Sequence, residues 1–214
     1  MITITETVRT IILEDDIAFQ AAQAGLLNYS AYAEKILPIV EQKTHKLVKK
    51  GTIVVALTRI TQELVVLPSL RPDVIVDDLS IKSPLCDITF QKTTLIRQKM
   101  ASLYKGITIS ENAFFTLTQS MSEVTIVAPQ SLLKDILAHF EEAPIAIYKD
   151  RVGITIRFAR EYLSIPNVLY TFQASLAVHR INFTEVVSTY TEFSFIIDKQ
   201  DLEIALQAMQ KFLK

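Results

Sequence analysis

The amino-acid sequence predicts an α+β fold, in which a helical N-terminal domain precedes two copies of a strand–helix–strand–strand–helix repeat. Apolar residues recur at helical spacing through the first third of the 214 residues. Two prolines in LPSLRP, residues 67–72, then interrupt that pattern and indicate a boundary. Beyond it, the same order of elements runs from about Val74 to Phe140 and again from about Val152 to Leu213. We therefore expect domains over residues 1–68, 73–149 and 150–214.

Helices are expected throughout the N-terminal domain. Thr5 can cap the first helix, and Asn28 or Ser30 the third, because their side-chain oxygens accept hydrogen bonds from free N–H groups at a helix start. Pro38 falls inside the third helix and must kink or split it. After the basic loop THKLVKKG, apolar residues recur every three or four positions, which predicts a fourth helix with Thr52 as its cap.

The two repeats are expected to differ in completeness. In the first, DVIVDDLSIKS is the opening strand, SPLCDITFQKT a loop that contains Cys86, and IAIYKDRV the fourth strand. The second repeat stops on its last helix, so its fourth strand must come from elsewhere or be absent. An absent strand would leave an open edge at which another chain can pair. An antiparallel βαββαβ sheet with two helices on one face follows a ferredoxin-like plan.

Composition excludes several classes of function. The four glycines are far apart, so no loop is available to cradle a phosphate or dinucleotide. One cysteine and three scattered histidines predict neither a disulfide nor a metal site, and we expect no cofactor and no enzymatic activity. The net charge of -1 makes no global case for nucleic acid. Without a signal peptide or an apolar run near the roughly 20 residues that span a bilayer, a cytoplasmic protein without membrane contact is expected.

The residue pattern of the second repeat resembles that of a known protein family. Strand Gly153–Phe158 leads into a loop that ends Ile165-Pro166-Asn167-Val168, and a helix over Val168–Val178 follows. The next strand opens Ile181-Asn182-Phe183, and TEFSFIIDKQDLEIAL reads as a strand that ends in an Asp beginning the last helix. In these features the repeat resembles the ACT domain, an amino-acid-binding module, and the tandem arrangement resembles the regulatory region of aspartokinases. The family usually has glycine where Asn167 stands, and Asn tolerates left-handed backbone better than most residues.

The resemblance implies an amino-acid site. A carboxylate would meet free N–H groups and the positive dipole end at a helix start. An α-amino group would meet Asn182 and the opening backbone of the next strand. The residues carried over are Ile165, Pro166, Asn167, Val168, Ile181, Asn182 and Phe183. The open alternative is that the loop is only a capped turn and the repeats only dimerise.

A basic turn in the N-terminal domain gives a second candidate site. From Lys35 to Arg59, six Lys and Arg residues accompany a single acid, Glu41. Helices separated by a short basic turn resemble a helix-turn-helix or winged-helix unit, whose lysines would contact phosphates. The nucleic-acid candidates are Lys46, Lys49, Lys50, Thr52 and Arg59. The alternative is a solvated turn that favours solubility.

These features predict a helix-turn-helix-like domain followed by two ferredoxin-like (ACT-like) units in a non-enzymatic regulatory protein. It would respond to an amino acid, form a homodimer through the ACT-like repeats, and regulate transcription through its N-terminal domain. Two other functions stay open. The chain could be a structural or protein-interaction module, or a free-standing regulatory subunit of an amino-acid biosynthetic enzyme.

Overall fold

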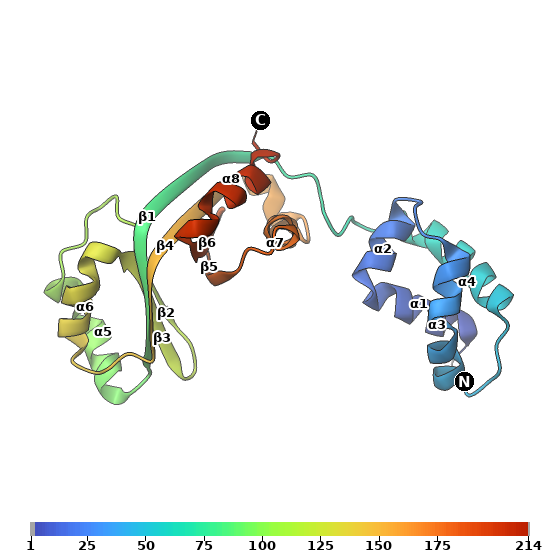
Figure 1. Ribbon diagram of the computed structural model, residues 1–214, viewed down its shortest axis with the longest axis horizontal. Coiled ribbons are helices and arrows are strands. Elements are labelled where there is room, and N and C mark those ends of the chain that lie inside the picture. Colours follow the sequence, from blue (N-terminus) through green and yellow to red (C-terminus); the bar gives the residue numbers. More distant parts are fainter. Residues whose placement is uncertain (1–2, 214) are drawn as a thin grey trace. The chain divides into compact units, whose positions relative to one another are not determined.

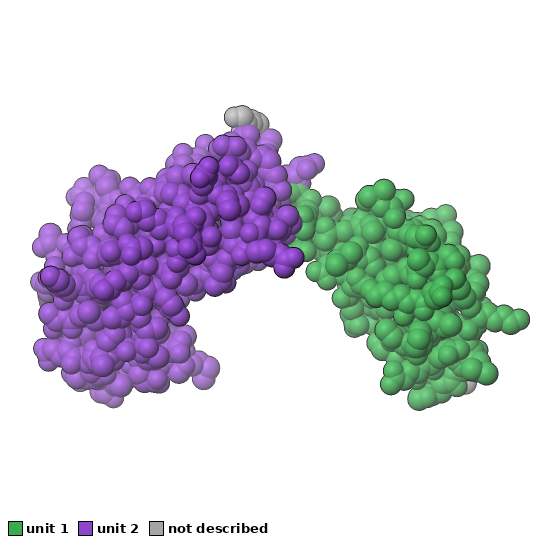
Figure 2. Space-filling model, viewed as in Figure 1, with its two compact units in different colours: residues 1–72, 165–170 green, residues 73–164, 171–214 purple. Residues whose placement is uncertain are grey.

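The structure is a computed structural model that describes residues 3–213, and these residues form two compact units. Unit 1 comprises the residues up to Pro72 together with Ile165–Tyr170, and unit 2 comprises Asp73–Ser164 and the residues from Thr171 onward (Figure 2). Unit 1 is helical, whereas unit 2 contains the strands.

Between Thr3 and Pro72, unit 1 folds into four helices (Figure 1). Each turns an apolar face inward, and the contacts run mainly between α4 and its neighbours α1 and α3. Their buried core includes Ile12, Ile36, Ile53 and Leu57. The helices are α1 (Ile4–Glu14), α2 (Asp16–Gln23), α3 (Tyr29–Thr44) and α4 (Lys50–Leu64).

Capping decides where these helices begin. Thr3, not Thr5, caps α1, because Thr3 and Glu6 satisfy each other's backbone N–H groups in a capping box. Asn28 caps α3 by accepting from the Ala31 N–H at 3.1 Å. The predicted Thr52 cap is wrong, since α4 begins at Lys50 and its cap residue, Lys49, makes no side-chain cap bond.

Two further expectations for unit 1 are corrected. Of the two effects predicted for Pro38, a kink or a split, the split is wrong, because α3 continues as one helix from Tyr29 to Thr44. Unit 1 contains no strand between Thr3 and Pro72, so the winged-helix alternative, which requires strands, is wrong for these residues. The helix-turn-helix arrangement itself stays a prediction.

Unit 2 is built on one six-stranded sheet in the order β2-β3-β1-β4-β6-β5, with neighbouring strands antiparallel. In Figure 1, α5 and α6 lie beside the end of the sheet that holds β2 and β3, and α7 and α8 beside the end that holds β5 and β6. The strands are β1 (Val76–Gln91), β2 (Thr116–Gln119), β3 (Glu123–Pro129), β4 (Ala146–Phe158), β5 (Phe183–Ser188) and β6 (Glu192–Asp198). The helices are α5 (Thr94–Gly106), α6 (Leu133–Phe140), α7 (Val168–Val178) and α8 (Leu202–Gln210).

Short 3-10 turns precede three of these helices. They are η1 (Gln130–Leu132) before α6, η2 (Arg160–Ser164) before α7, and η3 (Lys199–Asp201) before α8. The turn at η3 starts where the Asp198 side chain accepts from the Gln200 N–H at 3.1 Å. The same short connection from strand to helix therefore closes both repeats, at Pro129 and at Asp198.

The two repeats share their longest strands. Leu85–Gln91 of β1 pairs with β3, whereas the earlier residues of β1, Val76 to Lys82, pair with the second half of β4. The first half of β4 in turn pairs with Asp87–Thr89, so it is the fourth strand of the first repeat. The strand that the second repeat lacks at its end is therefore supplied by the beginning of β1.

This pairing corrects the prediction that SPLCDITFQKT is a loop and that DVIVDDLSIKS opens the first repeat. Both segments contribute to the single strand β1, and Cys86 is fully buried within it. Pro84 suggested a loop because proline removes a ladder hydrogen bond. The sheet accommodates it where the register with β4 shifts, between Lys82 and Leu85, as a bulge permits.

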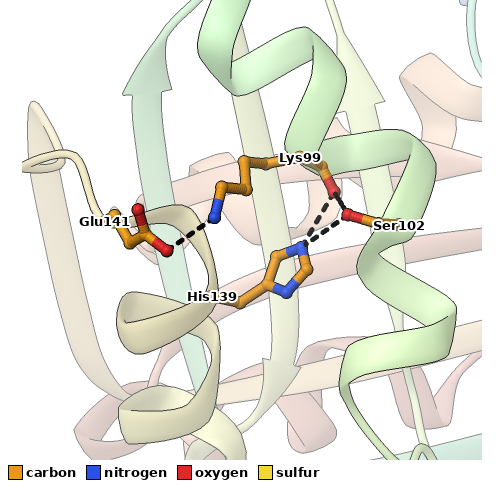
Figure 3. A network of polar contacts seen from close by, with 4 residues as sticks. All are labelled: Lys99, Ser102, His139 and Glu141. Carbon is orange, nitrogen blue, oxygen red and sulfur yellow. Dashed lines mark hydrogen bonds and ion pairs between the residues drawn. The ribbon is translucent and has the colours of Figure 1, made fainter.

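The helix pair α5–α6 is joined by a polar network (Figure 3). His139 Nε2 on α6 donates to the Lys99 carbonyl oxygen at 2.8 Å and lies 3.4 Å from Ser102 Oγ. The Lys99 ammonium pairs with the Glu141 carboxylate at 2.6 Å. The imidazole leaves no room at Gly106, where an added Cβ would lie 2.7 Å from His139 Nδ1.

We predict that Gly106→Ala destabilises unit 2 by about 1–3 kcal/mol, because the new methyl group would force the His139 ring out of its hydrogen bonds. Gly51→Ala is the matched control. It is also a helical glycine, nothing lies within 4 Å of its added Cβ, and it should stabilise unit 1 by about 0.5–1 kcal/mol. Urea unfolding measures both. A Gly106→Ala variant as stable as the native chain would contradict the predicted clash.

Candidate functional site

The loop before α7 has the backbone conformation that the sequence suggested. Asn167 has φ 70, in the left-handed region, and directly precedes Val168, the first residue of α7. Asn is one of the few residues other than glycine that adopts this region at low cost, so the turn survives without the family's glycine. The expectation that Asn167 tolerates a left-handed turn is confirmed.

The predicted amino-acid site falls into two groups of residues. Ile165, Pro166 and Asn167, with the buried Val168, belong to the segment that clusters with unit 1. The second group, Ile181–Phe183, belongs to unit 2. The binding role of the two groups stays a prediction.

Within the second group, the residues differ in what they can offer a ligand. Ile181 is buried, and its N–H donates to the Leu176 carbonyl at 3.3 Å. Phe183 opens β5, and its ring packs edge-on against Phe195 with centroids 5.8 Å apart. Asn182 is exposed. Of the three residues, Asn182 is thus the one whose side chain is available to solvent.

The basic candidates lie at the turn between α3 and α4. Lys46 and Lys49 are exposed, while the Lys50 ammonium is paired with the Glu34 carboxylate at 2.8 Å. Thr52 and Arg59 are exposed on α4. The structure thus places these five residues on one connection and the helix that follows it.

One exposed face of α4 continues from that turn. Thr52, Val55, Arg59 and Gln62 follow one another at helical spacing on the solvent side of the helix, opposite its buried residues. Val55 is 62% exposed, which is unusual for a β-branched apolar side chain next to a buried core. The face is therefore solvent-accessible and mixes polar groups with one apolar residue.

A buried charged cluster in unit 2 was missed by the sequence analysis. Asp87 of β1 is 2% exposed, and its Oδ1 has no hydrogen-bond partner among the described residues. The Arg151 guanidinium on β4 bonds to the Asp198 carboxylate of β6 at 2.9 Å through Nη1. The sequence contained one signal for this cluster, because Asp87 is a lone acid within the apolar run PLCDITF.

The surroundings of this cluster shift two carboxyl pKa values upward. Burial raises the pKa of Asp87, opposed by the Thr184 hydroxyl and the Arg151 charge. Burial also raises the pKa of Glu185 on β5, and the negative charge of Asp87 raises it further, while the Thr125 hydroxyl opposes the shift and Glu123 adds to it. The Asp87 charge therefore disfavours the ionised form of Glu185.

These contacts reveal the curvature of the sheet. Thr125 on β3 is close enough to Glu185 on β5 to affect the pKa of its carboxyl group, although β1, β4 and β6 separate these strands in the sheet order. A flat sheet would hold them about 19 Å apart, at about 4.8 Å per strand spacing. The sheet thus curls into an open half-barrel, and the charged cluster lies on its concave face.

Cys86 points to the opposite face, in the core shared with α5 and α6. Burial raises the pKa of its thiol to about 11, and the neighbouring Asp87 charge adds to the shift. The thiol is thus protonated at neutral pH. Cys86 thus lies in a strand and not in the predicted loop.

Two chemical features are missing from the part of the chain that the structure describes. Residues 3–213 gather no group of three or more His, Cys, Asp or Glu side chains fit to hold a metal ion. Over the same residues, no helix combines the length and apolarity needed to cross a membrane.

No family model matches the chain, and no curated protein matches it. Among solved structures, the aspartate kinase of Clostridium acetobutylicum aligns with a TM-score of 0.52 at 12% identity, over 64% of this chain and 35% of that chain. Crystallised aspartokinase alpha and beta subunits align with a TM-score of 0.51 at 15% identity, over 64% of this chain and 98% of that chain. The regulatory subunit of aspartate kinase from Thermus flavus aligns with a TM-score of 0.50 at 16% identity, over 64% of this chain and 99% of that chain.

At these identities the likeness shows the fold alone. The fold is a mixed α/β arrangement on an antiparallel sheet, of the kind found in the regulatory parts of aspartokinases. The resemblance to ACT-type regulatory domains is thus confirmed at the level of the fold. The chain spans 35% of the Clostridium acetobutylicum kinase, but nearly the whole of the Thermus flavus regulatory subunit.

We predict that Glu185→Gln stabilises the protein against urea at neutral pH. The gain in the free energy of unfolding should vanish near pH 4, because the ordinary pKa of a Glu carboxyl group is about 4.3. The sign follows from linkage. A raised folded-state pKa means that the folded protein holds its proton more tightly, so stability is lost as the pH rises through the shifted value. Gln cannot ionise and avoids that loss.

The background variant Asp87→Asn provides the control for this pH dependence. Without the Asp87 charge, the gain from Glu185→Gln at neutral pH should be smaller, because part of the shift at Glu185 comes from Asp87. An identical gain in both backgrounds would contradict the proposed repulsion between the two carboxylates.

Proposed function

We propose that the protein is a non-enzymatic regulatory protein whose ACT-like repeats respond to an amino acid. The observation that supports this most directly is the left-handed turn at Asn167 immediately before α7. Such a turn lets a loop approach a helix start, where free N–H groups and the positive dipole end attract a carboxylate. The exposed Asn182 offers a carbonyl oxygen to an α-amino group.

The pairing of repeats between two chains would couple binding to a response. In unit 2 the sheet ends at the strands β2 and β5, which are the two edges through which another chain can add strands. An amino acid that favours one arrangement of the paired repeats would shift the dimer between states by its difference in affinity for them. The homodimer is therefore part of the proposal.

A free-standing regulatory subunit of an amino-acid biosynthetic enzyme is the closely related alternative. It is favoured by the alignment with 99% of the Thermus flavus regulatory subunit, which is a separate chain. Co-purification with a biosynthetic enzyme would support this alternative over a protein that acts alone. A purely structural role would instead leave every amino acid without effect.

Isothermal titration of the full chain with each proteinogenic amino acid tests the proposal. We expect one amino acid, or a few of similar shape, to bind with a Kd in the micromolar to millimolar range, about −8 to −4 kcal/mol. The homodimer would be followed in the same samples by light scattering. If the titration of every amino acid gives only the heat of dilution, the proposed amino-acid response is wrong.

Two substitutions at Asn167 sharpen that test. Asn167→Gly keeps the left-handed conformation and should bind within about threefold of the native chain. Asn167→Val places a β-branched residue at φ 70, with a strain of about 1–3 kcal/mol, and should weaken binding by roughly tenfold or more. Equal binding by both variants would place the ligand elsewhere.

Nucleic-acid binding by unit 1 is a second candidate function. It is supported by the exposed face of α4, where Thr52, Arg59 and Gln62 follow the basic turn with Lys46 and Lys49. Polar side chains on a helix can contact base edges, and the lysines that precede the helix can contact phosphates. Val55 within that face and the pairing of Lys50 with Glu34 weaken the case.

We predict that, if this second function holds, the chain is retained on DNA at low salt and released as salt rises, because phosphate contacts displace counterions. The double variant Lys46→Glu and Lys49→Glu should abolish retention. Lys105→Glu, at the end of α5 in unit 2, is the control and should leave it unchanged. Retention that is absent, or equal in both variants, would favour a protein-interaction role for unit 1.

A further inference from the structure

A cavity of about 470 Å³ lies on the concave face of the sheet in unit 2. Its floor is one row of side chains across neighbouring strands. Ser80 of β1 is opposite Thr155 of β4, and Thr155 is opposite Ser194 of β6, with 2.8 Å between the last two hydroxyl oxygens. Val187 of β5 continues the row. The floor is therefore a line of hydroxyl groups that ends in an apolar side chain.

The other side of the cavity is formed by the segment between α5 and β2. Residues 111–116 line it, and Phe114 also packs against Leu85 and Ile196 on the same face of the sheet. Thr116 lines the cavity as well, and its hydroxyl oxygen is buried without a hydrogen-bond partner among the described residues. An unsatisfied hydroxyl costs free energy that a bound polar group would recover.

Charged groups of opposite sign lie at different ends of this cavity. Lys82 lines it from β1, and Glu192 lines it from β6. Within residues 3–213, the Lys82 side chain makes no hydrogen bond or ion pair, and the Glu192 carboxylate makes only a 3.5 Å contact with the Thr189 hydroxyl. Arg157, opposite Glu192 in register, is 4.0 Å from the Asp78 carboxylate. The cavity thus has a positive end and a negative end.

The strand register sets the separation of these two ends. Lys82 is in the row of Gly153, and Glu192 is in the row of Arg157, two strands away and four residues along β4. Their backbones are therefore offset by about 10 Å across the strands and about 13 Å along them. The two charged groups can approach each other only as far as their side chains reach from these backbones. A single carbon separates the charged groups of an α-amino acid, which is too short to bridge this span.

We infer that this cavity is a binding site for a small zwitterion whose ammonium and carboxylate groups are well separated, such as a dipeptide or an ω-amino acid. The carboxylate pairs with Lys82 and the ammonium with Glu192. The polar atoms between them bond to the hydroxyl row and to Thr116. The volume lies in the range of small-molecule pockets, about 300–1,000 Å³.

The site is separate from the loop at Asn167, since every lining residue belongs to unit 2. It does not depend on the proposed response to α-amino acids. Binding here would link β1, β4 and β6 to the segment before β2, and so hold the curled sheet in one curvature. A dicarboxylate would be repelled by Glu192 and Glu111, which both line the cavity, and a diamine by Lys82.

Saturation-transfer NMR and titration calorimetry on the full chain test the inference with glycylglycine and 6-aminohexanoate. Both should bind, and the tighter of the two identifies whether peptides or ω-amino acids are the natural class. N-acetyl-glycylglycine lacks the ammonium and glycylglycine amide lacks the carboxylate, so each should bind about tenfold more weakly. No signal for either zwitterion at about 10 mM, or equal binding of the blocked peptides, would overturn the inference.

Substitutions locate the binding. Lys82→Gln and Glu192→Gln should each weaken the binding of glycylglycine about tenfold. Lys149 is an exposed lysine on β4 outside the cavity, so Lys149→Gln should leave that binding unchanged. Thr116→Val should weaken binding while leaving the unliganded chain at least as stable, because it removes an unsatisfied hydroxyl. Asn167→Val should leave glycylglycine binding intact. The site would be refuted if the Lys149 and Lys82 variants lost the same affinity for glycylglycine, or if only the Asn167 variant lost it.

Discussion

The antiparallel pairing of β1 with β4 is the constraint on which the rest of unit 2 depends. These strands are the longest of the sheet, with 16 and 13 residues, and each takes part in both repeats. The second repeat has its fourth strand only because the beginning of β1 supplies it, so its sheet is not independent of the first repeat. Gly153 lies at the centre of this pairing, where an added Cβ would be 3.0 Å from Leu85 Cδ1. A side chain there would require the Leu85 side chain to shift at the point where the repeats join.

The curl of the sheet follows from this shared pairing and decides where charge is placed. Because β1 passes through both repeats, its positions on the concave face include Lys82 at the cavity and Asp87 in the buried cluster. The concave face thus holds charged and hydroxyl groups, while the apolar core lies under the helices on the convex face. Polar groups placed in a concavity lose water, which strengthens their interactions with a ligand and raises carboxyl pKa values.

The helical N-terminal unit has a different kind of stability. Its core comes from the apolar faces of four short helices, and local caps such as the Thr3–Glu6 box fix where they begin. Contacts there are local in sequence, whereas the sheet of unit 2 brings β1 against β4 across the intervening repeat. A regulatory role for the whole chain would therefore combine a locally built helical unit with a sheet built from distant segments.

The sequence by itself determined the class of most elements, because helical and alternating periodicity are local properties of the chain. It also indicated the repeat, the ACT-like fold and the left-handed turn at Asn167. Strand partners were decided only by the tertiary structure. Pro84 divided β1 into two apparent segments, and nothing local showed that the first of them pairs in the second repeat. The charged cluster of Asp87, Arg151 and Glu185 and the cavity between Lys82 and Glu192 arise from the same pairing. Their residues are far apart in the chain, and only the curled sheet brings them to one face.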